Sequence, residues 1–505
     1  MSAAPEHDLP AAALADTVFV ARRRELLAEL ARILPATRVI SEPEMLRVYE
    51  CDGLSAYRQA PLAVALPDSE AEVVAILKLC RRLGVPVVAR GAGTGLSGGA
   101  YPHAQGLLLV TARMNRMLEI NAEARYAIVE PGVRNLAISE AVAAHGLYYA
   151  PDPSSQLACS IGGNVAENAG GIHCLKYGLT VHNVLALRLV TIDGEVLELG
   201  HMAPESAGLD LLALAIGSEG LLGVVTEVTV RLLPRPPLAR CLLAAFADLA
   251  AAGEAVAAII AAGVIPAGLE LMDRGATEAV ERYIGAGYPA DAAAILLVES
   301  DGDAHTVAAE IEQVCAILTA HGATELRLAA DEAERQRFWA GRKAAFPATG
   351  TIAPDYYCMD GTIPRRHLGD MLTAIAAMQA RFGLRCVNVF HAGDGNLHPL
   401  ILYDANESGA LERAEAFGAE ILELTVRLGG SITGEHGVGI EKIGQMCVQF
   451  GEAERHAMHR LKAAFDPPGL LNPGKAIPSL HRCAEYGSRH GHHGTPQPFA
   501  ELPRF

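Results

Sequence analysis

The chain lacks the features that mark membrane-spanning and secreted proteins. No uncharged apolar run reaches the roughly 18 residues of a transmembrane helix, and the strongest candidate, residues 255–269, is interrupted by Pro266. The first 20 residues carry Glu6, Asp8 and Asp16 where a signal peptide would carry positive charge. These absences predict a cytoplasmic protein and leave open a peripheral contact with the inner face of the cell membrane.

Close cysteine pairs and an excess of positive charge are also absent. None of the 10 cysteines forms a C-x-x-C pair, which iron–sulfur and zinc clusters normally need, so we expect scattered reduced thiols. Lys and Arg number 41 against 58 Asp and Glu, for a formal net charge of -17. This balance argues against a nucleic-acid partner, because phosphate attraction needs clustered basic residues. With 505 residues, 51% of them hydrophobic, the chain is long enough for two or more domains.

The first half of the chain reads as strands with few helices. Helical spacing extends to about Tyr57, and "PLAVALPDSEAEVVAILKLCRRLGVPVVAR" then predicts a strand, a helix capped near Ser69 and ended by Gly84, and a second strand. Further strands are expected at "GLLLVTA", "YAIVEPG", "ALRLVTIDGEVLEL" and "GVVTEVTVRLLP", with a hairpin at the Asp-Gly pair 193–194. The Pro-rich stretch 234–237 reads as a domain boundary.

Beyond this boundary the pattern changes to strand, helix, strand, strand, helix, strand, running from "CLLAAFA" to "TELRLA". That order is close to the split βαβ arrangement. The later "FDPPGLLNPGKAIP" predicts a turn-rich strap, and the tail with "HGHHG" reads as a solvated surface segment rather than a metal-binding one.

The stretch "VVARGAGTGLSGGA" raises the question of a dinucleotide site. Gly93, Gly95 and Gly98 spell G-x-G-x-x-G after a strand. A Rossmann fingerprint must open a helix, but the chain continues as "YPHAQGLLLVTA", in which Pro102 and Gly106 disfavour one. Five glycines between residues 91 and 99 exceed what a bare turn needs. We therefore favour a backbone cradle for a pyrophosphate in a fold other than the Rossmann fold.

Two further glycine-rich segments support a polar cofactor lying against backbone. "PDPSSQLACSIGGNVAENAGGIHCLKYG" covers residues 151–178 and supplies hydroxyl and amide side chains beside glycine pairs. A long irregular loop without a task is the less attractive alternative. "GSEGLLGVVTEV", from residue 217, adds a third glycine-rich turn ahead of a strand.

Two short segments hold the candidate chemistry. "VFHAGDGNLHPLIL" places His391 and His398 on either side of a tight turn, and a hairpin would bring both imidazoles close enough to share an ion. "GGSITGEHGVGIEK" supplies Glu435 and His436. Two His and one carboxylate suit a catalytic metal with open positions. Structural histidines and a capping acid are the alternatives.

Three further segments are "WAGRKAAFPATG", "PDYYCMDGTIPRR" and "FDPPGLLNPGK". Together with the segments above, they resemble the FAD-linked D-2-hydroxyacid dehydrogenases of the vanillyl-alcohol-oxidase type. The resemblance is strongest to the FAD-binding catalytic (D) subunits of bacterial glycolate oxidases. The resemblance covers nearly the whole chain. It implies an α+β fold with a two-subdomain vanillyl-alcohol-oxidase/PCMH-type FAD-binding domain, a ferredoxin-like substrate (cap) domain and a C-terminal strap that returns to the flavin. The implied units are an N-terminal helical segment (1–56), the FAD-binding domain (57–236), the cap domain with the metal site (237–450), a C-terminal segment packing on the FAD domain (451–478) and a tail (479–505).

The resemblance also implies non-covalent FAD, because the first loop here has no His for covalent attachment. The implied FAD-binding residues are Arg90, Gly91, Ala92, Gly93, Thr94, Gly95, Ser97, Gly98, Pro151, Asp152, Ser154, Ser160, Gly162, Gly163, Asn164, Asn168, Gly170, Glu219, Gly220, Gly223, Val224 and Asn472.

For the chemistry, the resemblance makes His391, His398 and Glu435 the ligands of a divalent metal, zinc or manganese, and leaves His436 as the base. Arg342, otherwise read as a surface helix arginine, becomes the clamp for the substrate carboxylate. The expected reaction is hydride transfer from a small 2-hydroxy acid to flavin N5. Relatives acting on a dicarboxylate carry an extra Lys where this chain reads "YYCMDG", so glycolate or D-lactate is expected. A zinc-dependent hydrolase and a flavin-binding structural subunit are the rival interpretations.

The expected partners are an iron–sulfur subunit and a second flavin-fold subunit of a glycolate oxidase complex, which would pass electrons toward the membrane quinone pool. The sequence leaves open the choice between glycolate and D-lactate, the metal, the physiological acceptor and the oligomeric state.

Overall fold

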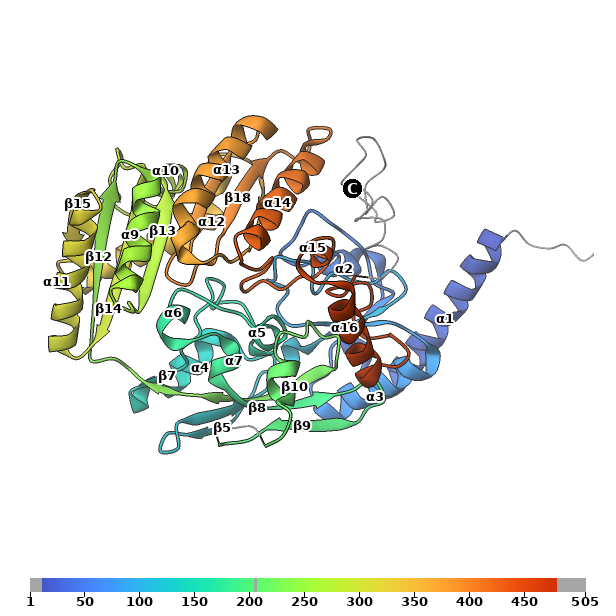
Figure 1. The fold of residues 1–505 in the computed structure, drawn as a ribbon. Coiled ribbons are helices and arrows are strands. Elements are labelled where there is room, and N and C mark those ends of the chain that lie inside the picture. Colours follow the sequence, from blue (N-terminus) through green and yellow to red (C-terminus); the bar gives the residue numbers. More distant parts are fainter. Residues whose placement is uncertain (1–10, 204–206, 479–505) are drawn as a thin grey trace, which may run out of the picture.

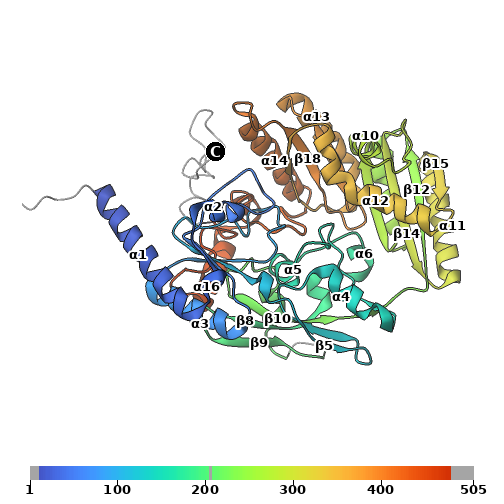
Figure 2. The same cartoon turned by 180° about the vertical axis from the view of Figure 1, so that it is seen from behind.

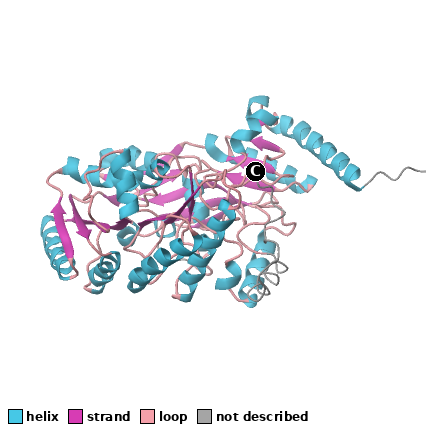
Figure 3. Cartoon of the chain, turned by 90° about the horizontal axis from the view of Figure 1, so that it is seen from above, coloured by secondary structure: helices cyan, strands magenta, loops and turns pink. Residues whose placement is uncertain are grey.

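The computed structural model describes residues 11–203 and 207–478. The first ten residues and the His-rich tail considered above lie outside the described residues. Figure 1 shows an N-terminal region, coloured blue to green, below a C-terminal region, coloured yellow-green to orange. The red C-terminal helix packs back on the N-terminal region, and Figure 3 shows that helix α1 projects from one end of the molecule.

The first sheet of the N-terminal region has the order β1-β2-β4-β3, with parallel pairs except β1 with β2. The helix between β2 and β3 begins and ends as predicted: Ser69 accepts a hydrogen bond from the Glu72 amide, and Gly84 ends the helix at φ +62°. After α1 the expected helical pattern stops, because Pro35 cannot continue it. The elements are α1 (Ala11–Ile33), β1 (Val39–Ile40), α2 (Pro43–Leu46), β2 (Ala63–Ala65), α3 (Glu70–Leu83), β3 (Val87–Arg90) and β4 (Leu107–Val110).

The second sheet of this region is antiparallel, in the order β5-β6-β10-β8-β9. The predicted hairpin is confirmed, with Gly194 at φ +74° between β8 and β9. Short helices cover the face toward the C-terminal region (Figure 1). The elements are β5 (Met117–Asn121), β6 (Tyr126–Val129), α4 (Asn135–Val142), β7 (Leu147–Tyr148), α5 (Ile161–Glu167), α6 (Cys174–Tyr177), α7 (Thr180–Asn183), β8 (Val184–Val190), β9 (Val196–Gly200), α8 (Leu211–Ala215), β10 (Val224–Arg231) and β11 (Leu233–Pro234).

The C-terminal region is built on one antiparallel sheet of order β15-β12-β14-β13-β17-β18-β16. Its first four strands have the predicted split βαβ order, with the helix α10 added between β13 and β14. The other three strands extend the sheet. The sequence pattern predicted β17 and β18 as a hairpin, but it did not indicate β16 or that the hairpin joins this sheet. The elements are β12 (Leu238–Phe246), α9 (Leu249–Ala261), β13 (Gly268–Asp273), α10 (Arg274–Tyr283), β14 (Ala294–Gly302), α11 (Ala304–Ala320), β15 (Ala323–Leu328), α12 (Glu332–Ala348), β16 (Asp355–Cys358), α13 (Leu368–Phe382), β17 (Cys386–Phe390), β18 (Pro399–Tyr403) and α14 (Ala410–Arg427).

Both faces of this sheet are buried, which explains its almost continuously apolar strands. Along β12, Leu242, Ala244 and Phe246 pack with α9, α11, α13 and α14. The alternating residues Cys241 and Leu243 pack with α10 and α12 on the other face. The opposite views of Figures 1 and 2 show α14 and α12 on the two sides. The predicted α+β class is confirmed.

The predicted C-terminal strap is also present. After α15 (Met446–Gln449) and α16 (Glu452–Phe465), Leu471 forms a parallel bridge with Val87 of the first sheet, and the Asn472 amide donates to the Val87 carbonyl. The Asn472 side chain donates to the carbonyls of Gly99 and Glu219. The strap therefore ties the first and third glycine-rich segments together.

Of the described cysteines, eight are free, as expected. Cys447 is disulfide-bonded, so the expectation of reduced thiols is wrong for that residue. Among the described helices, none is sufficiently long and apolar to cross a membrane.

Partly buried ion pairs join the two regions. His173 Nδ1 lies 2.8 Å from Asp152 Oδ2 on the same region, and Nε2 lies 3.4 Å from Glu299 Oε1 on β14. Lys176 Nζ and the Tyr177 hydroxyl both bond the carboxylate of Asp301. Burial alone would lower the pKa of His173, but the carboxylates of Asp152 and Glu299 outweigh it and raise the pKa to about 10.

The charged His173 should therefore make the stability of the protein depend on pH. Because its pKa is raised in the folded state, its stabilising contribution is complete below 6.5 and is lost as pH rises through about 10. We expect His173→Gln to lower the free energy of unfolding by about 1–3 kcal/mol at neutral pH, and this loss to vanish in alkali. Urea unfolding of both proteins across this range is the measurement, with the exposed His145→Gln as control. A pH-independent difference would contradict the assignment.

Candidate active site

A cavity of about 650 Å³ lies between the glycine-rich segments and the C-terminal region. Most residues predicted to bind the cofactor line it, together with three of the residues predicted for the chemistry. These are Arg90, Gly91, Ala92, Gly93, Thr94, Gly95, Ser154, Ser160, Gly162, Gly163, Asn164, Glu219, Gly220, Gly223, Val224, His398, Glu435 and His436. The three segments, far apart in sequence, thus share one cavity.

The glycine loop joins β3 directly to the parallel strand β4 without a helix, as predicted. A Rossmann unit is therefore excluded at this loop. A Cβ at Gly91 would lie 2.0 Å from Ser160 Oγ, so the absence of a side chain lets the first two segments touch. At Gly95 nothing lies within 4 Å of the Cβ position, which faces the open cavity.

The other residues predicted to bind the cofactor do not line the cavity but lie behind the residues that do. Ser97 donates to the Gly437 carbonyl, and a Cβ at Gly98 would meet Ile440. The Pro151 carbonyl accepts from Asn135, Asp152 binds His173, and Asn168 accepts from the Val181 amide. A Cβ at Gly170 would lie 2.6 Å from Glu435 Oε2, and Asn472 lies in the strap. In this structure these residues contact neighbouring segments of the protein rather than the cavity.

The predicted hairpin of β17 and β18 brings the two histidines together. Asn388 pairs with Pro399, and the rings of His391 and His398 lie 5.0 Å apart. Glu435 Oε1 lies 3.0 Å from His398 Nε2 and 3.3 Å from His391 Nε2. The three side chains offer donor atoms within 4.8 Å of one another. Burial alone would raise the pKa of Glu435, but hydrogen bonds from both histidines lower it well below its usual value.

Behind His391 lies a buried acid, Glu270, that the sequence analysis did not predict as a site residue. Glu270 Oε1 lies 2.8 Å from His391 Nδ1, and Glu270 Oε2 accepts from Arg342 at 2.7 Å. A single Glu within the apolar strand "AGLELMD" was the available signal, because a buried carboxylate needs a partner. Glu270 fixes the ring orientation of His391, the usual role of a carboxylate behind a ligating histidine.

Arg342 is not a surface residue, since its side chain is 1% exposed. Two of its nitrogens are engaged by Glu270, and Nη2 also lies 3.4 Å from His391 Nδ1. Within the described part of the chain, its Nη1 is buried without a hydrogen-bond partner. It does not line the cavity, where the next residue, Lys343, stands with Phe346.

A second missed acid, Asp360, holds the loop that carries Glu435 and His436. Its carboxylate accepts the amides of Gly434, Glu435 and His436 and the hydroxyl of Thr433, at 2.6–3.1 Å. Lys442 Nζ lies 3.3 Å away. Although burial alone would raise the pKa of Asp360, the His436 ring, when it is protonated, and the Lys442 ammonium lower it. The Asp of "MDGT" gave no separate signal in sequence.

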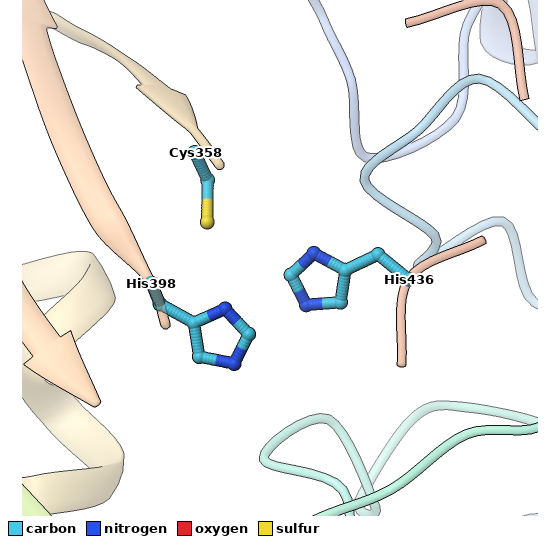
Figure 4. Close-up of side chains that lie close together, drawn as sticks. All are labelled: Cys358, His398 and His436. Carbon is cyan, nitrogen blue, oxygen red and sulfur yellow. The ribbon is translucent and has the colours of Figure 1, made fainter. Parts of the chain in front are cut away.

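His436 faces the cavity beside His398. The two rings stack with centroids 4.7 Å apart and planes at 10°, and Figure 4 shows them converging with Cys358. Burial lowers the pKa of His436 to about 4, which leaves the ring neutral. Within the described residues, Nδ1 of His398 and Nδ1 of His436 are both buried without a partner. Such atoms are costly unless they meet a ligand.

A glycine-lined cavity with a His–carboxylate cluster at one end lies between the two regions. A crystal structure of p-cresol methylhydroxylase with substrate bound superposes with a TM-score of 0.78, at 17% identity, over 91% of this chain and 98% of that one. This likeness shows the fold.

Residues 61–200 match the family model "FAD binding domain", and residues 235–476 match "FAD linked oxidases, C-terminal domain". The chain belongs to the FAD-linked oxidases and is an FAD-dependent oxidoreductase. The predicted family is thereby confirmed.

Three relatives extend this result over nearly the full length. The chain is 62% identical over 483 residues to "Glycolate oxidase subunit GlcD" of Escherichia coli K12, covering 96% of this chain and 97% of the relative. It is 41% identical to the Bacillus subtilis protein of the same name, covering 85% and 91%. A D-lactate dehydrogenase of Archaeoglobus fulgidus is 33% identical, covering 90% and 99%.

The open position at Gly95 gives a direct test of the cavity. We expect Gly95→Leu to fold but to retain less than about a tenth of the FAD, since the new side chain enters the space that FAD needs. The flavin absorbance per protein, with circular dichroism for folding, is the measurement. Gly350→Leu is the matched control, because its Cβ position is also open and it lies outside the cavity lining. Full flavin content in Gly95→Leu would contradict this placement of FAD.

Proposed function

We propose that this chain is the catalytic subunit of a glycolate oxidase or dehydrogenase complex and oxidises a small 2-hydroxy acid, glycolate first, to the 2-keto acid. One observation carries the proposal: the His–carboxylate cluster opens into the same cavity that the glycine-rich segments line. The identity to the GlcD relatives supports glycolate, and the more distant D-lactate dehydrogenase keeps D-lactate as the second candidate. A zinc-dependent hydrolase would not need the glycine-lined cavity, so this cavity favours the oxidoreductase over the hydrolase.

All the residues predicted to bind FAD are proposed to hold it non-covalently. Those that line the cavity are proposed to contact FAD directly. The others are proposed to support the lining residues: Ser97, Gly98, Pro151, Asp152, Asn168, Gly170 and Asn472. They fall in the proposed FAD-binding unit, 57–236, and in the strap, 451–478. When bound, FAD supplies the hydride acceptor at N5. The substrate loses a hydride from C2 and a proton from its hydroxyl, so that the alcohol becomes a carbonyl.

His436 is proposed to accept the hydroxyl proton, because it is the cavity-facing histidine that the His391–His398–Glu435 set leaves free. Asp360 supports this role by fixing the backbone on both sides of Glu435. Arg342 is proposed to bind the substrate carboxylate through Nη1, the guanidinium atom without a partner among the described residues. Because Arg342 does not line the cavity, this contact requires the neighbouring lining residues Lys343 and Phe346 to move aside when substrate binds.

The proposed substrate unit, 237–450, contains a proposed divalent-metal site of His391, His398 and Glu435. The donor set fits such an ion, since two imidazoles and one carboxylate converge, and Glu270 orients one ring. Zinc and manganese both suit these ligands. Such an ion supplies positive charge that favours loss of the hydroxyl proton.

The base is tested by anaerobic flavin reduction with a panel of short 2-hydroxy acids. We expect glycolate to bleach the flavin of the wild type, and His436→Ala to slow this by at least about 100-fold while keeping FAD bound. His456→Ala, on the remote helix α16, is the control. Stopped-flow absorbance is the measurement. An undiminished rate in His436→Ala would refute the base, and a flavin that no hydroxy acid reduces would refute the reaction.

The metal is tested by elemental analysis. His391→Ala and His398→Ala should lose the ion and at least about 100-fold in activity while keeping the flavin spectrum, because the FAD-lining segments lie elsewhere. The exposed His305→Ala is the control. A metal-free wild type with full activity would overturn the site.

We further propose that the chain is cytoplasmic and assembles with an iron–sulfur subunit and a second flavin-fold subunit, with peripheral contact to the membrane. The chain has no C-x-x-C pair for a cluster of its own, and the first loop is not a Rossmann unit. Reduced flavin therefore needs another acceptor, and the relatives named glycolate oxidase subunits support a complex. Pull-down from native extract should recover an iron-containing partner. Recovery of this chain alone, iron-free and fully active with oxygen, would refute the complex.

A further inference from the structure

A second set of ligand atoms lies beside the proposed metal site. Cys358, His398 and His436 each bring one donor atom, and the three atoms lie within 4.8 Å of one another. Figure 4 shows the thiol and the two rings converging on one gap. This set contains a sulfur and lacks the carboxylate, so its chemistry differs from that of His391, His398 and Glu435.

The register between strands β16 and β18 places Cys358 and His398 next to each other. Cys358 ends β16 and pairs with Leu400 of β18. His398 precedes Leu400 by two residues, which places it on the same face as Leu400 and diagonally next to Cys358. The loop held by Asp360 then brings His436 against His398, with the rings stacked. All three positions are therefore fixed by the surrounding fold.

One ring nitrogen of each histidine in this set lacks a hydrogen-bond partner within the described part of the chain. Nδ1 of His398, a residue 1% exposed, and Nδ1 of His436 are buried and, among the described residues, without hydrogen bonds. The Cys358 thiol has a weak contact of 3.4 Å with the Met359 carbonyl. Buried ring nitrogens next to a thiol are the expected state of a site that accepts an ion.

We propose that Cys358, His398 and His436 form a second metal site that takes a thiophilic divalent cation such as zinc or cadmium. Thiolate and imidazole select such ions, whereas a carboxylate-containing set also suits the harder manganese. On binding, the S–H bond of Cys358 breaks, a sulfur–metal bond forms and the proton goes to solvent. The metal keeps its charge, and no electrons are transferred.

The two sets exclude one another because they share His398. A neutral imidazole has one nitrogen with a free lone pair and one that carries hydrogen. With an ion on Nδ1, the Nε2–H of His398 donates to Glu435, which lies 3.0 Å away. The Nε2 atom of His398 then cannot bind the ion of the first set, and His436 is bound to the second ion. We expect thiophilic ions added in excess of the ion that fills the first site to inhibit the enzyme. This consequence rests on the proposed function, whereas the binding itself does not.

Binding is tested on the FAD-loaded full-length chain by titration with cadmium, read by thiolate-to-cadmium ultraviolet absorption. The wild type should show an absorption step that Cys358→Ser lacks. Cys386→Ser, which removes another free buried cysteine, is the matched control and should keep the step. The flavin spectrum reports folding, and Cys358→Ala replaces Cys358→Ser if serine is not tolerated. Equal absorption in the wild type and the Cys358 variant would overturn the site.

Inhibition is tested on the same proteins supplied with manganese. Zinc should inhibit the wild type and Cys386→Ser at similar concentrations, while Cys358→Ser should need at least about 10-fold more, because even the loss of an outer-shell partner weakens metal binding by that factor. Equal inhibition of the wild type and Cys358→Ser would show that zinc does not inhibit through this site and would overturn that expectation. If no hydroxy acid reduces the flavin of any variant, the proposed function fails, and the cadmium absorption still decides the second site.

Discussion

The site depends on the carboxylate of Asp360. It accepts three successive backbone amides, from Gly434 to His436, and so gives the 433–437 loop one conformation. Backbone amides inside a protein need acceptors, and a charged acceptor makes the stronger bonds. Without this anchor, neither Glu435 nor His436 would have a fixed distance to the hairpin of β17 and β18.

A second constraint is that the cavity belongs to both regions of the chain. The glycine-rich segments supply its N-terminal walls, and α12, the hairpin and the Asp360 loop close it from the other side. The ion pairs around His173 and Asp301 hold the regions in this relation, and the strap through Asn472 fixes two of the glycine-rich segments against each other. The same contacts that stabilise the fold therefore also set the distance between the flavin segments and the His cluster.

Buried charges at this site come as connected groups. Arg342, Glu270 and His391 form a chain in which each charge has a partner, and Glu219 accepts the amides of Val438 and Gly439 across the regional boundary. Burying isolated charges would be costly, whereas paired ones can be retained for the geometry that they impose. Glu270 and Asp360 escaped the sequence reading because nothing local to them shows what they face.

The sequence by itself determined the contacts between residues that are close together in the chain or that face each other across one hairpin. The helix between Ser69 and Gly84, the helix-free glycine loop and the approach of His391 to His398 follow from local steric rules and short-range pairing. Only the tertiary structure decided that Asp152 binds His173 rather than lining the cavity, that Arg342 is paired with Glu270, and that Cys358 faces two histidines. Those contacts join segments far apart in the chain, so they depend on how whole sheets pack, which local patterns do not specify.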